Sequence, residues 1–203
     1  MTRLSIRSLI SLLLCWLCLL GTLAHADTLL DRRTSGTPSP LWRHADFVSN
    51  TALIATVAGA IWLGSEDGAG RAMWQGAEGF VLADVAADGL KRVFGRERPS
   101  ETDDPGLWFK HGRSFPSGHV ASTAAAVTPL ILEFADEYPA VWLLAAVPAY
   151  EMVSRVETRS HWQTDVLAGL ALGVAVGYVE HRHGPWTLRA IPGGVYVGFR
   201  KAF

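Results

Sequence analysis

Cysteine is almost absent from this chain of 203 residues: there are two, Cys15 and Cys18, and both lie within the first twenty positions. Neither follows a small residue, so neither is placed like the acylated cysteine of a lipoprotein. The rest of the chain therefore has no disulfide bridge and no thiol chemistry, whatever the redox state of its compartment.

A strong charge of either sign is also missing. Lys and Arg together number 18 and Asp and Glu number 19, and no basic patch runs along the chain. Nucleic-acid-binding domains concentrate positive charge on one face or stripe, so the sequence predicts no nucleic-acid partner. The positive residues of interest are gathered around three short polar clusters between residues 91 and 165.

Long apolar runs are scarce, and the first of them lies at the N-terminus. Arg3 and Arg7 open the chain, 9–20 is almost wholly apolar, and Ala-His-Ala at 24–26 has the small-x-small pattern of a signal peptidase site. We predict a cleaved signal peptide at 1–26 and export to the periplasm. The alternative is an uncleaved anchor, although the run is short for a membrane span of roughly 20 residues.

Cleavage would remove 26 residues with two arginines and no acid, leaving 177 residues with 16 basic and 19 acidic side chains. That length suffices for one domain with a core.

Hydrophobic periodicity and helix-boundary residues predict an all-α bundle of about five to six helices. A flexible leader at 27–40, rich in Thr, Ser, Gly, Pro and Arg, should precede a helical domain at 41–184. Its predicted helices cover 47–65, 72–94, 117–136, 139–153 and 161–180. Pro148 should kink the fourth helix, and Ser117 is placed to cap the third.

The last predicted helix and the tail have patterns of their own. Gly169, Gly173 and Gly177 recur every four residues on one helix face, which would let another helix approach closely. Beyond the bundle, 185–203 alternates apolar with other residues around a Pro-Gly-Gly turn at 192–194, so we predict a short β-hairpin-like tail.

Whether the bundle spans a membrane is left open. After the N-terminal segment only 47–65, with 19 uncharged residues, approaches the required length. The sequence fits a soluble or membrane-associated periplasmic protein, and also a multi-pass inner-membrane protein with its site facing the periplasm. It gives no indication of the oligomeric state.

The first polar cluster combines Lys91 and Arg98, which two helical turns could bring to one side, with Arg92 and Arg96. We interpret Arg92 and Arg96 as solvated members of this stretch. Taken alone, such a set of charges is typical of an ordinary exposed helix face.

The second cluster, Pro-Ser-Gly-His at 116–119, lies at a predicted helix start. Free backbone N–H groups at such a start bind anions, and Gly118 lets an oxyanion approach the backbone. An ordinary capped helix with an incidental histidine, His119, is an equally good interpretation of this cluster alone.

The third cluster contains Arg155, His161 and Asp165. A separation of four residues would put His161 and Asp165 on one face of a helix. The carboxylate could then accept the imidazole N–H, fix the tautomer and leave the other ring nitrogen as a lone-pair donor. A zinc site of His119, His161 and Asp165 lacks the short-range ligand pair usual for zinc, and three nearby cations would oppose it.

Together the clusters form an ordered signature: Lys-x6-Arg-Pro at 91–99, Pro-Ser-Gly-His at 116–119 and Ser-Arg-x5-His-x3-Asp at 154–165. With every position filled, it resembles the signature of the type 2 phosphatidic acid phosphatase and vanadium haloperoxidase superfamily. The resemblance covers about residues 79–177.

The resemblance implies that His161 attacks phosphorus, that Asp165 orients it, and that His119 protonates the leaving oxygen. It also implies which groups hold the phosphate oxygens: Lys91, Arg98, Ser117, Gly118 and Arg155. No metal and no cofactor is expected, because the cations balance the phosphate charge. The expected partner is a phosphorylated lipid at a membrane surface.

Three further cations, Arg159, Lys110 and Arg113, suggest contacts to a second phosphate and hence a diphosphate substrate. Glu157 offers Arg159 a local ion pair as the simpler alternative.

The leading functional hypothesis is an envelope phosphatase acting on a lipid phosphate or diphosphate, such as undecaprenyl diphosphate, phosphatidate or phosphatidylglycerol phosphate. The alternatives are a soluble nonspecific acid phosphatase and a vanadate-dependent haloperoxidase. A non-enzymatic phosphate-binding module is a fourth, although a complete signature argues against it. The short chain, without large insertions around the motifs, argues against the peroxidase.

Overall fold

The periodic apolar segments of the sequence form a helical bundle in the computed structural model, which describes residues 30–183, 186–191 and 194–199. Within these residues there are five α-helices: α3 (Ala45–Leu63), α4 (Gly68–Phe94), α5 (Gly118–Phe134), α6 (Ala146–Glu157) and α7 (Gln163–His183). The 3-10 helices η1 (Pro40–His44) and η2 (Pro139–Ala145) precede α3 and α6. The prediction of an all-α bundle is confirmed. The predicted signal peptide lies outside the described residues.

Local sequence explains both ends of α4. Asp67 caps α4, its carboxylate accepting hydrogen bonds from the amides of Ala69 and Gly70. Gly95 ends the same helix in the left-handed conformation (φ 51°), which glycine adopts without steric cost.

Ser117 is the N-cap residue of α5, as predicted, but its side chain makes no capping hydrogen bond. The boundary predicted for the fourth helix was wrong. Pro148 was expected to kink a helix that began at Pro139. The 139–145 stretch is instead the separate helix η2, and Pro148 lies in the first turn of α6. An N–H has no intrahelical partner in that turn, so proline is tolerated there.

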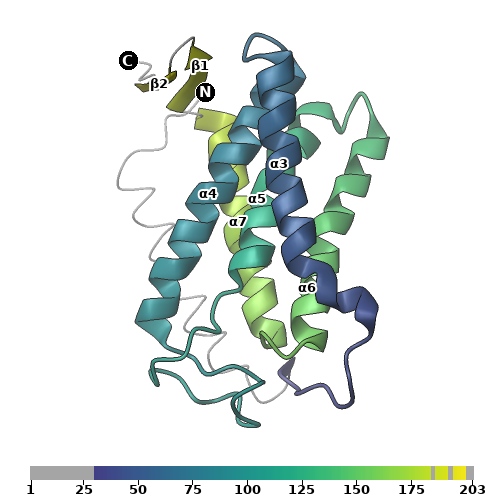
Figure 1. The fold of residues 1–203 in the computed structure, drawn as a ribbon, viewed down its shortest axis with the longest axis vertical. Helices are drawn as coiled ribbons and strands as arrows, with labels where there is room; N and C mark the ends of the chain where they lie inside the picture. The colour runs from purple at the N-terminus through teal and green to yellow at the C-terminus, as the bar shows by residue number, and fades with distance from the viewer. Residues whose placement is uncertain (1–29, 184–185, 192–193, 200–203) are drawn as a thin grey trace.

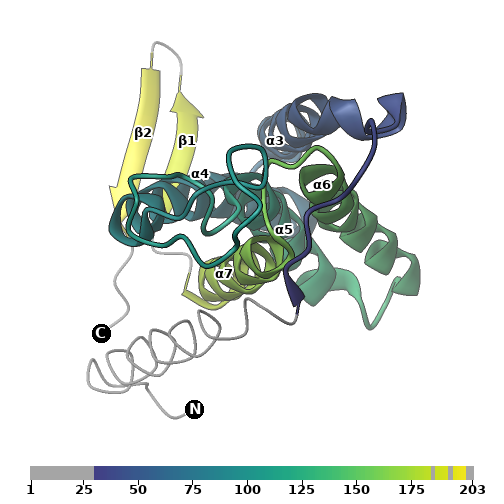
Figure 2. The same ribbon diagram turned by 90° about the horizontal axis from the view of Figure 1, so that it is seen from below.

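Helix α5 is the centre of the bundle and packs most extensively against α4 on one side and α7 on the other. Figure 2 shows it surrounded by the other helices. Small residues allow this close approach. An added Cβ at Gly76 of α4 would collide with the carbonyl oxygen of Ala126, and one at Gly173 of α7 with that of Ala121. The predicted role of the glycines of α7 is therefore confirmed, and the core between these helices is rich in alanine.

The alternation of helix direction brings the polar clusters together. Successive helices run in opposite directions, so α4 and α6 end where α3, α5 and α7 begin, at the lower end of the bundle in Figure 1. The loop 95–117 lies at this end, which we call the site end. The first and last turns of five helices can therefore contribute to one site.

Two features lie outside this arrangement. Strands β1 (Trp186–Ile191) and β2 (Gly194–Phe199) pair antiparallel, as predicted for the tail. Among the described residues, the stretch Pro40–Leu63 is long and apolar enough to cross a membrane. Only 17% of its most apolar window is buried, and Trp62 is 88% exposed.

Candidate functional site

His161 lies in the loop immediately before α7, and its ring is almost completely buried. The Nδ1 atom is 2.6 Å from the backbone carbonyl oxygen of Ser114. A carbonyl oxygen only accepts hydrogen bonds, so Nδ1 carries the hydrogen and Nε2 keeps its lone pair. Burial lowers the pKa of His161, which favours this neutral form. The side chain is thus held in the protonation state of a nucleophile.

This geometry corrects the predicted relation between His161 and Asp165. The helix begins at Gln163, so the two residues do not share a helix face. The Oδ2 atom of Asp165 is 3.8 Å from Nδ1, too far for a hydrogen bond, and the backbone of Ser114 takes the expected place of the carboxylate. Asp165 instead fixes the surrounding loops. Its Oδ2 accepts from the Ser114 hydroxyl and, at 2.9 Å, from the backbone N–H of Trp162.

Arg96 is the second correction, because the predicted solvated residue has no exposed side-chain surface. Its guanidinium donates to Asp165 Oδ1 and to Asp31 Oδ2, both at 2.6 Å, and stacks over the ring of Trp108. Burial raises the pKa of Asp165, but His161, Arg96 and Ser114 outweigh burial and hold that pKa below its usual value. Arg96 therefore helps to keep a buried carboxylate ionised near His161. Arg92, by contrast, is exposed, as predicted, and pairs with Asp88.

Asp31 ties the predicted flexible leader to this network. Besides Arg96, its carboxylate accepts from the backbone N–H of Thr164 at 2.7 Å and from the Thr164 hydroxyl at 2.6 Å. Asp31 is buried, so this part of the 27–40 segment is held in place instead of moving freely. Its partners are more than 60 residues away in the chain, which local composition could not reveal.

The other polar clusters surround the start of α5. An added Cβ at Gly118 would lie 3.1 Å from the ammonium nitrogen of Lys91. Because glycine has no side chain, the Lys91 ammonium can lie close to the backbone at the start of α5. Burial lowers the pKa of Lys91, and the charge of Arg98 acts in the same direction while Asp84 opposes it. Both cations also disfavour a positive charge on His161.

Ser117 has a buried hydroxyl that finds no hydrogen-bond partner among the described residues. A buried polar group without a partner is costly, and a bound anion beside the first N–H groups of α5 would satisfy it. We call the five residues predicted to hold phosphate the phosphate cradle: Lys91, Arg98, Ser117, Gly118 and Arg155.

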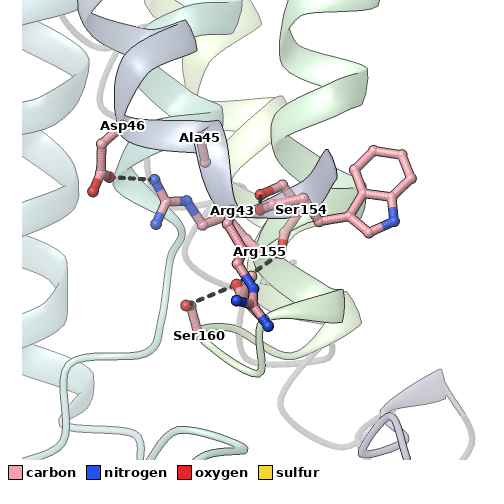
Figure 3. Close-up of a pocket in the computed structure, with 8 residues that line it drawn as sticks. Arg43, Ala45, Asp46, Ser154, Arg155 and Ser160 are labelled. Atoms are coloured by element: carbon pink, nitrogen blue, oxygen red, sulfur yellow. Dashed lines mark hydrogen bonds and ion pairs between the residues drawn. The ribbon is translucent and has the colours of Figure 1, made fainter. Parts of the chain in front are cut away.

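Arg155 enters the cradle from the last turn of α6. Its guanidinium lies between two carboxylates: Nη2 is 2.8 Å from Asp46 Oδ1, and Nε is 3.4 Å from Glu151 Oε2. Glu151 is buried and also accepts a hydrogen bond from Ser49 at 3.0 Å. Figure 3 shows the contact with Asp46 beside a pocket of about 190 Å³ that Arg43 and Arg155 help to line.

His119 completes the site from the first turn of α5. Its Nε2 atom is 2.8 Å from the same oxygen of Asp46 that contacts Arg155. Burial lowers the pKa of His119 to about 4, and the charge of Arg155 acts with burial, whereas Asp46 acts against it. His119 is thus placed beside the cation that would bind a phosphate oxygen.

The three predicted contacts to a second phosphate are placed differently. Arg159 donates to the carbonyl oxygens of Thr34 and Gly36, at 2.9 and 2.6 Å, and so fastens the leader. Arg113 pairs with Asp88, and Lys110 is exposed. Two of the three cations are therefore already engaged with the protein.

The arrangement combines a neutral buried imidazole, a second imidazole and three cations at the start of a helix. Such a set can bind a phosphoryl group, attack it and protonate the group that leaves.

Four carboxylates and one hydroxyl of this arrangement were not predicted from the sequence as site residues: Asp31, Asp46, Glu151, Asp84 and Ser114. Most of their contacts are with residues distant in the chain, such as those of Asp31 with Thr164 and of Asp46 with Arg155. Glu151 is the exception, since it lies four residues before Arg155 on α6. Among residues 30–182, no group of three or more His, Cys, Asp or Glu side chains is placed to hold a metal ion.

Comparison with known proteins places this site in a family. The family model described as the PAP2 superfamily matches residues 73–188, more than half of the chain. A lipid A 1-phosphatase of Porphyromonas gingivalis is 33% identical over 111 residues, which are 53% of this chain and 23% of that protein.

Two further relatives match over similar regions. A lipid A 1-phosphatase of Rhizobium johnstonii is 33% identical over 110 residues, covering 49% of this chain and 44% of that protein. A decaprenylphosphoryl-5-phosphoribose phosphatase of Mycolicibacterium smegmatis is 39% identical over 92 residues, covering 45% and 48%. The matched region spans less than half the length of each of these relatives. No solved structure matches the chain.

Proposed function

Because the chain belongs to the PAP2 superfamily, we propose that it is a metal-independent phosphatase that hydrolyses a lipid phosphate through a phosphohistidine on His161. The single observation that carries the proposal is the hydrogen bond from His161 Nδ1 to the Ser114 carbonyl, which leaves a lone pair on Nε2. That nitrogen belongs to a buried neutral ring beside Lys91 and Arg98, the surroundings that a nucleophile towards phosphorus requires.

The reaction proceeds in two transfers. Nε2 of His161 forms a bond to phosphorus while the bond from phosphorus to the lipid oxygen breaks, and His119 gives its proton to that oxygen. Water then attacks the phosphohistidine, the N–P bond breaks, and the neutral His119 takes a proton from the water. Inorganic phosphate leaves and His161 returns to its starting form.

The phosphate cradle supplies the charge that this chemistry needs. In the transition state, negative charge spreads over the nonbridging oxygens of the phosphoryl group, and fixed cations and N–H groups stabilise it there. Lys91, Arg98 and Arg155 provide three positive charges. The Ser117 hydroxyl and the amides that follow it provide donors, so the proposed reaction requires no metal ion.

Two observations favour a lipid as the leaving group. The relatives are named as phosphatases of lipid A and of a decaprenylphosphoryl compound. In this chain, four apolar side chains at the site end are each more than half exposed, and we call them the apolar rim: Leu41, Phe47, Val93 and Phe109. Exposed apolar groups around a charged site suit the junction between a phosphate headgroup and its hydrocarbon. On this proposal the protein is exported and works at the periplasmic face of a membrane.

The test is phosphate release by the full-length protein purified in mild detergent and assayed with a metal chelator present. Substrates would be phosphatidate, phosphatidylglycerol phosphate, undecaprenyl diphosphate, lipid A, decaprenylphosphoryl-5-phosphoribose and p-nitrophenyl phosphate. We expect release from at least one lipid with a kcat/KM well above that for p-nitrophenyl phosphate. Equal turnover of all substrates would favour a nonspecific acid phosphatase, and His161→Ala with unchanged turnover would overturn the mechanism.

A further inference from the structure

One oxygen of Asp46 occupies the space between the two groups that the proposed reaction assigns to different substrate oxygens. Oδ1 lies 2.8 Å from Nε2 of His119 and 2.8 Å from Nη2 of Arg155. In the reaction, His119 gives a proton to the leaving oxygen and Arg155 binds a nonbridging oxygen. A carboxylate oxygen in this position has the charge and hydrogen-bond pattern of a phosphate oxygen.

The contact also directs the proton of His119. A carboxylate only accepts hydrogen bonds, so the hydrogen of His119 lies on Nε2 and points at Asp46. The same hydrogen is the one that the leaving oxygen must receive. While Asp46 holds it, the general acid has no proton directed towards substrate.

Asp46 is placed to move away when a stronger anion arrives. It lies in the first turn of α3, and its side chain is 79% exposed, whereas that of Arg155 is 13% exposed. Swinging into solvent would therefore restore the hydration of the carboxylate at little steric cost. The other titratable groups that face His119 are the Arg155 guanidinium from α6 and the neutral His161 ring from the loop before α7, and both are held by further contacts inside the bundle.

We propose that Asp46 is a positioning residue that stands in for a phosphate oxygen in the free enzyme, holding His119 and Arg155 in place until substrate phosphate displaces it. It competes with every anion that enters the cradle. It also favours the protonated form of His119 before substrate binds, since the negative charge opposes the loss of that proton.

The inference rests on the proposed function, but anion binding tests it without any turnover. The probes are inorganic phosphate and orthovanadate, titrated calorimetrically at pH 7 into the full-length wild-type protein and Asp46→Asn. Asparagine removes the competing charge and keeps the shape, so both probes should bind about tenfold more tightly, which corresponds to one charge-assisted hydrogen bond. Asp46→Glu retains the charge and should bind both probes with nearly wild-type affinity.

Asp136→Asn is the matched control, because Asp136 is exposed in the turn after α5, far from the site end. It removes the same charge from the molecule and should leave both affinities unchanged. Equal or weaker binding of both probes to Asp46→Asn, with an unchanged unfolding midpoint, would overturn the inference. Should no lipid release phosphate while Asp46→Asn still binds the probes more tightly, the proposed function would fail and the role of Asp46 as a competing anion would stand.

Discussion

At the scale of single residues, the proposed mechanism requires a protonated His119 in surroundings that disfavour its charge. Burial and Arg155 together lower its pKa to about 4, so the free enzyme holds little imidazolium at neutral pH. The same proposal requires a neutral His161, and burial favours that form. The two histidines thus differ in their contacts: the Ser114 backbone carbonyl contacts His161, the proposed nucleophile, and the Asp46 carboxylate contacts His119, the proposed acid.

The pH dependence of kcat/KM follows from this difference. A general acid acts only while protonated, so kcat/KM should fall as the pH rises through the pKa of His119 near 4 and above it. The fall in kcat should lie at a higher pH, because a bound phosphoryl group stabilises the imidazolium. The measurement is a pH series of initial rates with wild type and His119→Asn. In the variant, kcat should be about 10²–10⁴-fold lower, and the fall in rate with rising pH should disappear. A flat kcat/KM between pH 4 and 8 would contradict the assignment.

The ordered signature was sufficient to select the candidate residues from the sequence, and the structure brings most of them to one end of the bundle. The positions of Arg96 and Asp165 were not predictable in the same way. Arg96 follows the left-handed residue Gly95, which turns it away from the helix face and towards carboxylates 65 and 69 residues away. Local spacing describes neighbours on one helix, and such partners meet only after the bundle has formed.

At the scale of elements, the site depends on how closely α7 and α4 approach α5. Helix periodicity predicted the helices themselves because each buries one face of small or apolar residues. It did not separate η2 from α6, because a run of apolar residues after Pro139 suits either helix type. The close packing of α7 against α5 places Asp165, in the first turn of α7, beside Ser117 at the start of α5. The backbone N–H of Ser117 donates to the carbonyl oxygen of Asp165 at 3.0 Å.

Gly173→Ala tests this packing, because the new Cβ would collide with the carbonyl oxygen of Ala121. Overpacking of this kind should lower the free energy of unfolding by about 1–3 kcal/mol. Gly89→Ala is the matched control, since this exposed glycine of α4 has no atom within 4 Å of an added Cβ. Alanine there should raise the free energy of unfolding by about 0.5–1 kcal/mol. Denaturant titration of both variants is the measurement. Equal effects in the two helices would show that the α5–α7 contact is looser than described.

At the scale of the whole molecule, a charged site lies at one end of a bundle whose outer surface carries many exposed apolar side chains. Such a surface is unusual for a soluble monomer and suits contact with lipid. The apolar rim joins this surface to the phosphate cradle.

Replacing Phe47 and Phe109 of the apolar rim with serine should therefore affect lipid substrates selectively. A phenylalanine side chain that is buried against the hydrocarbon of a lipid substrate should raise kcat/KM about tenfold. We expect a loss of at least that size with phosphatidate in mixed micelles and little change with p-nitrophenyl phosphate. Leu143→Ser, in η2 at the other end of the bundle, serves as the control for an exposed apolar residue. Parallel losses on both substrates would indicate damage to the site itself.

The central claim, that His161 carries the phosphoryl group, is tested most directly by trapping the intermediate. Full-length protein would be mixed with ³²P-labelled lipid phosphate and quenched in alkali, in which phosphohistidine is stable. The wild type should retain label that is stable to alkali and released by acid, mapped to the peptide containing His161. His161→Asn should retain none. Label on another residue, or normal turnover by His161→Asn, would contradict the account.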